Sequence, residues 1–473
     1  MRAHLLALVL TGFAALAHAQ PPLPPQVAQR LAAARIPASG VGILMQEVGS
    51  NRPALQLNEN AAMNPASVMK LVTTYAALEV LGPAYRWKTE VWAVANLREG
   101  VLEGDLYIKG GGDPKLDLEA FWMLLRTLRG KGLREIRGDL VLDRSYFEGV
   151  AGDPGRFDGD PFRPYNVLAD ALLVNYRSVR FTFVPEPERG AVRVYAEPRP
   201  PALEVANVLR LTEGGCPEGR AFRDLLKPTF EPARQRVIFA GQYPVSCGER
   251  ELNVALLEPN DQVGGTLRQL WTEIGGTWGG AVREGAVPAG ARLLHGADSA
   301  LLAEIVRDTN KFSNNVMARH LFLTLGAEHA GTPATYAKAN LAVRAWLARK
   351  GLKAPEFVIE NGSGLSRIER LSAATLGALL QDAWRSAVMP EFIASLPLTA
   401  ADGTMRRRLK SDGVAGRAHI KTGLLSDQGV RSMAGYLLDR SGRRMVIVMM
   451  VNHPNAHQAQ EAMDTLLRWA YDR

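Results

Sequence analysis

A serine and a lysine lie three residues apart in the segment Ser67-x-x-Lys70. On a helix this spacing places the hydroxyl and the amine on one face, within a few ångströms of each other. A serine hydroxyl becomes a good nucleophile when a base removes its proton, and a lysine can act as that base if burial or a nearby cation lowers its pKa. Lys70 has the apolar neighbours Met69, Leu71 and Val72. We therefore expect a buried amine that activates Ser67, with a solvated helix start as the plainer alternative.

Two further motifs carry groups that can handle a peptide substrate. Ser313 and Asn315 are two residues apart on an expected turn, where the hydroxyl can relay a proton and the carboxamide can hold a substrate amide. An ordinary helix cap is the alternative for this pair. Lys421-Thr422-Gly423 ends an expected strand, and its cation, hydroxyl and bare backbone suit a substrate carboxylate and an extended peptide.

The order of the three motifs is more informative than any one of them. A Ser-x-x-Lys at the head of a buried helix, a Ser-x-Asn between helices and a Lys-Thr-Gly on a late strand are together the signature of penicillin-binding proteins and serine β-lactamases. The order therefore indicates acyl transfer through a serine ester. No His-Glu-x-x-His pair or other metal-ligand pattern is present in the sequence, so we expect neither a metal nor a cofactor.

Length and composition indicate several globular units. The chain has 473 residues, of which 47% are hydrophobic and 22% charged, which excludes a disordered or low-complexity chain. The net charge of +8 is spread along the sequence without a basic stripe. This pattern argues against a nucleic-acid binder and is compatible with an anionic surrounding.

The first 19 residues resemble a cleavable signal peptide. A polar start is followed by an apolar run over 5–16, too short to span a bilayer, and then by Ala17-His18-Ala19. A buried N-terminal helix is the alternative. We expect export and cleavage before Gln20, with no transmembrane anchor afterwards.

Export bears on the two cysteines, Cys216 and Cys247, which are 31 positions apart in a region rich in glycine and proline. An oxidising compartment favours one disulfide between them. Two free thiols are the alternative.

Hydrophobic periodicity locates the elements that must position these groups. It predicts strands over 41–48 and 54–57, a helix over 68–81 that is apolar on nearly every face, and short alternating strands from 89 to 253. Helical patterns follow over 262–274, 300–309, 315–325, 336–350 and 373–384, and strands over 418–422, 432–438 and 444–451 precede a last helix over 457–471. We expect an α+β fold in which the first and last strands are neighbours in one sheet, with a large β-rich insertion after the buried helix.

The sequence resembles the D-alanyl-D-alanine carboxypeptidase/endopeptidases among the class C low-molecular-mass penicillin-binding proteins. The resemblance covers essentially the whole chain after the signal peptide and is carried by residues 64–78, 109–114, 313–315, 361–367 and 419–423. The 246 positions between Ser67 and Ser313 are typical of this branch, which inserts one domain with another nested inside it. The resemblance implies a penicilloyl-serine transferase domain, an antiparallel sheet flanked by helices, made of residues 20–88 and 254–473. The insertion would be 89–253, with the inner domain at about 165–245.

The resemblance also implies a role for each motif residue. Ser67 would attack a D-Ala-D-X carbonyl with Lys70 as its base, and Ser313 would pass a proton to the leaving amine. Asn315 would bind the acyl side of the substrate. The terminal carboxylate would be received by Lys421, Thr422 and Gly423. The oxyanion hole would be the backbone N–H groups of Ser67 and Leu424.

The implied partners are peptidoglycan stem peptides as substrates and β-lactam antibiotics as covalent inhibitors, in the periplasm, with the oligomeric state open. A serine β-lactamase and a non-catalytic penicillin-sensing or wall-binding protein are the alternatives. The chain departs from the family pattern at two positions, since Leu424 stands where threonine is common and Asn361 where aspartate is common. We expect a structural role for the loop around Asn361, and for residues 110–114 a turn in the insertion.

Overall fold

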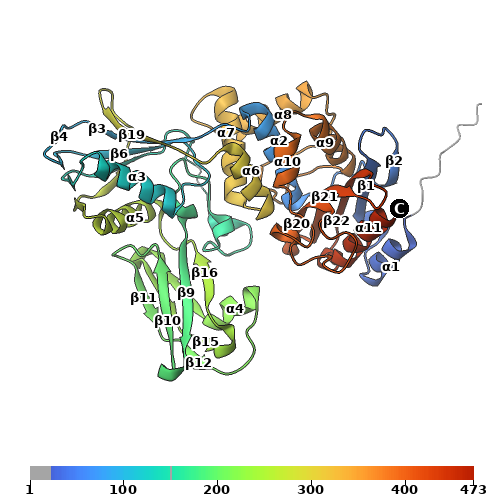
Figure 1. Cartoon of the computed structure of the whole chain (residues 1–473), viewed down its shortest axis with the longest axis horizontal. Helices are drawn as coiled ribbons and strands as arrows, with labels where there is room; N and C mark the ends of the chain where they lie inside the picture. Colours follow the sequence, from blue (N-terminus) through green and yellow to red (C-terminus); the bar gives the residue numbers. More distant parts are fainter. Residues whose placement is uncertain (1–22, 150–151) are drawn as a thin grey trace, which may run out of the picture.

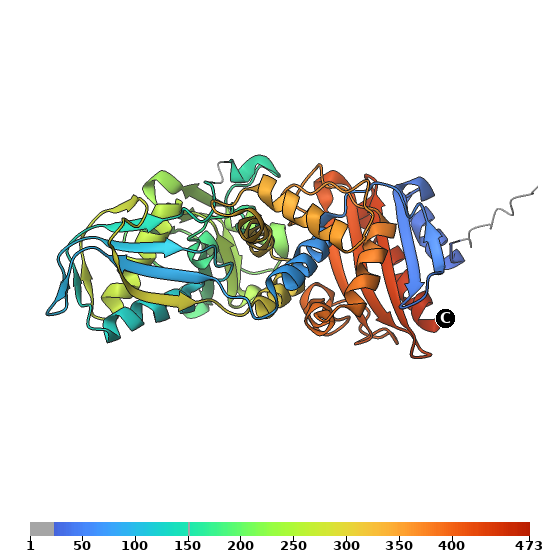
Figure 2. The ribbon, with the colours of Figure 1, turned by 90° about the horizontal axis from the view of Figure 1, so that it is seen from above.

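The computed structural model describes residues 23–149 and 152–473, so the expected signal peptide lies outside the described residues. A unit of helices around one sheet occupies the right of Figure 1, and a strand-rich part extends to the left and below it. The second view shows the two parts end to end along the long axis of the molecule (Figure 2). Within the described ranges, no helix is long and apolar enough to cross a membrane.

The sheet of the helix-rich unit is antiparallel and has the strand order β2-β1-β22-β21-β20. Its members are β1 (Val41–Glu47), β2 (Pro53–Leu57), β20 (Ala418–Leu425), β21 (Val430–Leu438) and β22 (Arg444–Asn452). The pairing of β1 with β22 confirms that the first and last strands of the unit are neighbours. β20, which carries Lys421-Thr422-Gly423, is an edge strand of this sheet.

Alternate residues of the central strands pack against helices on opposite faces of the sheet. Leu44, Val446 and Val448 belong to one core and Ile43 and Ile447 to the other. The first core contains α2 (Lys70–Leu81), α6 (Leu302–Lys311), α7 (Asn315–Ala330), α8 (Tyr336–Arg349), α9 (Ala373–Arg385) and α10 (Met389–Ser395), and the second contains α1 (Pro25–Ala33) and α11 (Gln460–Asp472). Because both faces are covered, β22 is a continuous apolar run. The predicted α+β architecture is confirmed.

The insertion leaves the helix-rich unit after α2 and returns before α6. Its outer part has one sheet of order β18-β8-β6-β3-β19 and another of order β17-β7-β5-β4. These are built from β3 (Lys88–Ala93), β4 (Leu97–Arg98), β5 (Val101–Leu102), β6 (Leu106–Gly110), β7 (Glu135–Ile136), β8 (Leu140–Asp143), β17 (Thr277–Trp278), β18 (Val282–Glu284) and β19 (Arg292–Asp298), with helices α3 (Leu118–Gly130) and α5 (Pro259–Glu273). β3 pairs with β19 so that Lys88 lies opposite Asp298. The chain therefore enters and leaves the insertion at adjacent points.

The predicted end of the insertion at residue 253 is wrong, because α5 and β17 to β19 belong to the outer part. β18 and β19 lie in the same sheet as β3. Leu267 and Leu270 of α5 are buried in one core with Phe121 and Leu125 of α3. An amphipathic helix does not reveal from its own sequence which core covers it. The sequence therefore places α5 in the helix-rich unit, whereas it belongs to the insertion.

The inner part has three small sheets, β10-β9-β16, β11-β14-β13 and β12-β15. They are formed by β9 (Val179–Glu186), β10 (Ala191–Glu197), β11 (Glu204–Asn207), β12 (Arg210–Thr212), β13 (Pro228–Glu231), β14 (Arg236–Phe239), β15 (Gln242–Pro244) and β16 (Arg250–Val254), with one short helix, α4 (Gly219–Leu226). These elements span 179–254 rather than the predicted 165–245. The stretch before β9 instead packs on the helix-rich unit, where Val167 and Leu173 share a core with Val316 of α7.

A buried histidine holds the outer part of the insertion against α7. His320 is fully buried, its Nδ1 lies 3.0 Å from the Gly112 carbonyl oxygen, and its Nε2 accepts a hydrogen bond from the Asp170 amide. Because a carbonyl can only accept, Nδ1 carries the proton and the ring is neutral. Burial lowers the pKa of His320 to about 4. The loop after β6 thus has a structural contact with the helix that carries Asn315.

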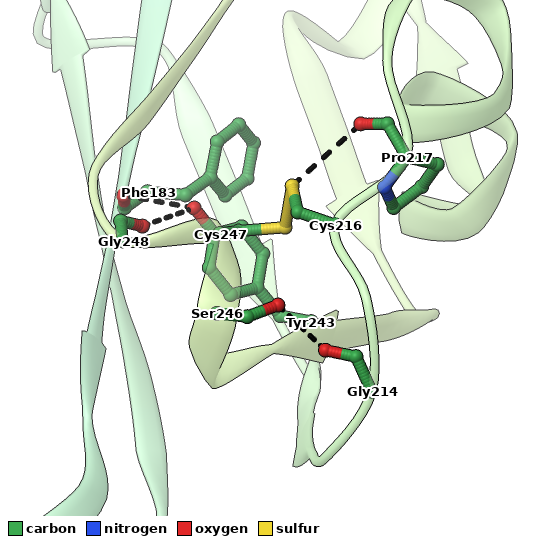
Figure 3. Close-up of a disulfide and its surroundings, with 8 residues drawn as sticks. All are labelled: Phe183, Gly214, Cys216, Pro217, Tyr243, Ser246, Cys247 and Gly248. Carbon is green, nitrogen blue, oxygen red and sulfur yellow. Dashed lines mark hydrogen bonds between the residues drawn. A yellow bond between two sulfur atoms is a disulfide. The ribbon is translucent and has the colours of Figure 1, made fainter.

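Cys216 and Cys247 form a disulfide in the inner part (Figure 3). It joins the segment after β12 to the turn after β15, and Tyr243 beside it donates a hydrogen bond of 2.7 Å to the Gly248 carbonyl. The expected disulfide is present, and the alternative of two free thiols does not hold.

Replacing both cysteines (Cys216→Ser with Cys247→Ser) should lower the free energy of unfolding of the inner part by about 2–4 kcal/mol, because the bridge removes chain entropy from the unfolded state. Circular dichroism melting curves measure this loss. Wild-type protein held in reductant is the matched control and should melt with the double variant. A double variant that melts with the oxidised wild type would contradict the expectation.

Candidate active site

The nucleophile candidate lies where a 3-10 helix passes into α2. Residues Ala66–Met69 form the 3-10 turn and α2 begins at Lys70. Side chains three apart are eclipsed in a 3-10 helix, which aligns Ser67 with Lys70 more closely than an α-helix would. Lys70 Nζ lies 3.0 Å from Ser67 Oγ. Ala66 precedes Ser67 with φ of 47°, a left-handed conformation that is costly for alanine and is typical of functional sites.

The Lys70 amine is fully buried and has two further oxygen neighbours. Nζ donates to Asn315 Oδ1 at 2.6 Å and to the Ser363 carbonyl. Both of these oxygens can only accept hydrogen bonds, whereas the Ser67 hydroxyl can also donate one. A neutral amine has two hydrogens, so two acceptors use both and leave its lone pair for the Ser67 proton. The contacts of Lys70 therefore match those of a neutral amine poised as a base.

The charges around Lys70 favour the neutral form. Burial lowers its pKa well below the usual lysine range, and the positive charges of Lys421 and Arg319 lower it further. Glu369 acts in the opposite direction. Desolvation and like charge are the two effects that convert a lysine into a base near neutral pH.

Ser313 and Lys421 face each other across the site. Ser313 occupies the turn between α6 and α7 with φ of 57°, and its Oγ accepts a hydrogen bond of 2.8 Å from Lys421 Nζ. Lys421 is fully buried, and burial lowers its pKa to about 7. Nζ also donates to the Thr422 carbonyl at 2.7 Å. The Thr422 hydroxyl donates to Thr404 Oγ1 at 2.8 Å, which places a second hydroxyl at this end of the site.

Gly423 allows β20 to approach the backbone of the nucleophile. A Cβ at position 423 would lie 2.9 Å from the Ser67 amide nitrogen and 2.3 Å from Ser432 Oγ, so no larger residue fits. The Ile420 N–H donates to Pro397 O at the outer edge of β20. Because backbone direction alternates along a strand, the N–H of Leu424 points to that same edge. The Leu424 side chain is 47% exposed. The two backbone N–H groups expected to form an oxyanion hole therefore lie on adjoining segments.

The loop around Asn361 supports Lys70 from the other side. Asn361 Oδ1 accepts from the Ser363 amide at 2.9 Å and from the Ser363 hydroxyl at 2.6 Å, and its Nδ2 donates to the Leu365 carbonyl. Thr73 of α2 donates to the Gly362 carbonyl at 2.7 Å. The amide of Asn361 is thus occupied in shaping the turn that presents the Ser363 carbonyl to Lys70.

Sequence reasoning missed one buried carboxylate, Glu369. Its side chain is fully buried, and Oε1 accepts hydrogen bonds from the N–H groups of Glu360 and Asn361. Burial raises its pKa to about 6. The segment Arg367-Ile368-Glu369-Arg370 reads as a solvated charged turn, and a single sequence contains no signal that distinguishes its glutamate. Sequence reasoning also missed Arg319 and Thr404, because nothing in a single sequence distinguishes these two residues from others of their type.

The three motifs therefore come together at one place. The two cysteines lie in the inner part of the insertion and are not part of this site. In residues 23–149 and 152–473, no group of three or more His, Cys, Asp or Glu side chains could hold a metal ion. The arrangement pairs a nucleophile with a buried base, two backbone donors and a cation, which is the set needed for acyl transfer.

Comparison with known proteins gives relatives over nearly the whole chain. The model of the D-Ala-D-Ala carboxypeptidase 3 (S13) family matches residues 23–472. A D-alanyl-D-alanine carboxypeptidase of Actinomadura sp. strain R39 is 28% identical over 87% of this chain and 78% of its own. The D-alanyl-D-alanine carboxypeptidase DacB of Haemophilus influenzae is 23% identical over 88% of this chain and 85% of its own.

Solved structures share the fold. Penicillin-binding protein 4 of Haemophilus influenzae superimposes with a TM-score of 0.74 at 21% identity, covering 93% of this chain and 99% of that one. A predatory endopeptidase of Bdellovibrio bacteriovorus gives a TM-score of 0.53 at 15% identity, covering 90% and 91%. With a family model that spans the described chain almost from end to end, the protein belongs to the D-Ala-D-Ala carboxypeptidase 3 (S13) family of peptidases.

Proposed function

We propose that this peptidase hydrolyses peptidoglycan through an acyl ester on Ser67. It removes the terminal D-Ala of D-Ala-D-Ala stem peptides and cleaves D-Ala-diaminopimelate cross-links, and β-lactams acylate the same serine. The observation that carries the proposal is the set of three oxygen contacts around the buried Lys70 amine. The names of the S13 relatives support the carboxypeptidase activity, and the sequence of residues 1–19 supports a periplasmic location.

Acylation begins when Lys70 takes the proton of Ser67 and Ser67 Oγ attacks the carbonyl carbon of the scissile bond. Negative charge develops on the carbonyl oxygen, which the N–H groups of Ser67 and Leu424 stabilise. One donor of this kind contributes about 3 kcal/mol in other serine enzymes. Because these donors are backbone groups held by the 3-10 turn before α2 and by β20, they need no rearrangement as the charge forms.

The leaving side of the substrate lies toward β20. The Lys421 ammonium and the hydroxyl of Thr422 receive the terminal carboxylate. The proton that Lys70 took from Ser67 passes through Ser313, which is hydrogen-bonded to Lys421, to the departing amine, and Lys70 is neutral again. Asn315 holds the acyl side while accepting from Lys70. Water then attacks the ester with Lys70 again as base, which releases the shortened peptide and restores Ser67.

The two alternative functions are less well supported. A β-lactamase needs a base positioned to activate a deacylating water. Glu369, the buried carboxylate that acts on Lys70, does not fit that role, because it is fully shielded from solvent with one oxygen held by two amides. A non-catalytic penicillin sensor would not need the low pKa of Lys70. The lifetime of a bound penicillin, milliseconds for a β-lactamase or hours for a peptidase, distinguishes the two functions.

Ser67→Ala should reduce D-Ala release from a pentapeptide by at least about 1,000-fold, because the nucleophile is lost while the fold is kept. Release is measured with purified protein, and cross-linked muropeptides analysed by mass distinguish loss of one D-Ala from conversion of dimers to monomers. Ser441→Ala, on a turn before β22, is the matched control and should keep wild-type activity. Wild-type rates in Ser67→Ala would refute the acyl-Ser67 mechanism.

The pH profile of kcat/KM for a D-Ala-D-Ala peptide should be bell-shaped. Activity rises as Lys70 loses its proton and falls as Lys421, whose pKa is about 7, loses the charge that receives the substrate carboxylate. The alkaline limb should therefore lie near pH 7 and should disappear with a substrate whose terminal carboxylate is amidated. A profile that keeps rising to pH 9 with the free carboxylate would contradict the role of Lys421.

Glu369→Gln should move the acid limb of that profile to lower pH. The Glu369 carboxylate raises the pKa of Lys70, so removing its charge makes Lys70 easier to deprotonate, while the glutamine oxygen still accepts from Glu360 and Asn361 N–H. Acylation by a chromogenic β-lactam from pH 4 to pH 8 measures the limb. A limb that stays in place, or moves to higher pH, would contradict the view that the Glu369 charge raises the pKa of Lys70.

A further inference from the structure

A large cavity adjoins the site on the side of the insertion, lined by residues of α3, of the inner sheets and of the turn between α6 and α7. Its volume is about 1150 Å³, above the upper end of the range for drug-sized ligands, about 1,000 Å³. Ser313 and Asn315 form part of one wall, and Arg180 and Asn253 of the inner part lie in another. A ligand in this cavity would therefore lie next to a peptide bound at Ser67.

Aromatic side chains line the cavity from four segments of the chain. Phe312, directly before Ser313, is 67% exposed, and Tyr165 is 41% exposed. Trp122 of α3 and Tyr176 before β9 also line it. The Tyr165 carbonyl accepts hydrogen bonds from Asn315 Nδ2 at 3.4 Å and from Arg319, so this aromatic residue is tied to the catalytic turn. Exposed aromatic rings beside polar groups are typical of surfaces that bind ligands with both flat apolar faces and polar edges.

The charges of the lining cancel. Three arginines (Arg163, Arg180 and Arg223) face three carboxylates (Asp117, Glu119 and Glu197). A lining without net charge gives no attraction for a polyanion such as a nucleic acid. The remaining polar groups are neutral amides and hydroxyls, including Asn175, Asn253 and Ser178. Sugar rings have apolar faces that stack on aromatic rings and hydroxyls that bond to amides, so a neutral glycan fits this chemistry.

We propose that the cavity binds the glycan strand to which the stem peptide at Ser67 is attached. This inference rests on the proposed peptidoglycan substrate and extends it from the stem peptide to the sugar chain. The insertion then contributes to substrate binding, because its aromatic rings and amides form most of the glycan subsite. The remaining wall of this subsite is the turn from Ser313 to Asn315. Attachment of the glycan to the same substrate makes its binding intramolecular once the peptide is bound.

Binding of a neutral glycan, an oligomer of N-acetylglucosamine, to Ser67→Ala protein tests the proposal directly. The oligomer should bind, and Trp122→Ala should weaken binding at least about fivefold, which is the loss typical of an aromatic contact at an interface. Met123→Ala is the matched control, since Met123 lies on the same helix, is 52% exposed and does not line the cavity. No binding by Ser67→Ala, or equal binding by both variants, would overturn the proposal.

Kinetics separate this proposal from the proposed function. In otherwise wild-type protein, Trp122→Ala should leave kcat and KM for a small acyl-D-Ala-D-Ala peptide unchanged and raise KM for the same peptide carried on a disaccharide. An equal effect on both substrates would overturn the glycan subsite. A wild-type protein that cleaves neither substrate would refute the peptidase function, whereas glycan binding by Ser67→Ala would still decide the occupant of the cavity.

Discussion

The desolvation of one amine, Lys70, is the constraint on which the rest of the site depends. A buried ammonium is costly unless it is paired, and the residues around Lys70 do not pair it strongly, since two cations oppose one carboxylate. This arrangement needs a helix that is buried on every face, and residues 70–78 of α2 are all buried. The same burial that stabilises the fold therefore generates the base.

The close approach of separate segments is the second requirement. β20, α7 and the loop around Ser363 reach Ser67 from distant parts of the sequence, and small residues make the approach possible. At Gly364, whose φ is 81°, a Cβ would lie 1.9 Å from the Ala66 carbonyl. The insertion leaves this geometry intact, because Trp87 and Ser299 at its two ends are joined by a backbone hydrogen bond of 2.9 Å. Because the insertion starts and ends at adjacent points, it does not move α2 away from α6.

The elements of the helix-rich unit could be predicted from the sequence, since apolar runs and alternation report burial directly. β22 is one such run, and the three motifs mark residues that the structure brings together. Two things could not be predicted. The core that covers α5 depends on tertiary contacts, and that helix belongs to the insertion. The burial of Glu369 depends on two backbone amides that fold over it, and a charged turn gives no sign of them.

The most direct test of Ser67 as the nucleophile and Lys70 as its base is to identify the residue that a penicillin acylates and to measure the rate of acylation at several pH values. The protein is incubated with benzylpenicillin, digested and sequenced by mass spectrometry, with Lys70→Met as a parallel sample. We expect one adduct, on the peptide that contains Ser67, that forms faster as the pH rises through the lowered pKa of Lys70 and is nearly absent in Lys70→Met. An adduct on another serine, or undiminished labelling of Lys70→Met, would contradict it.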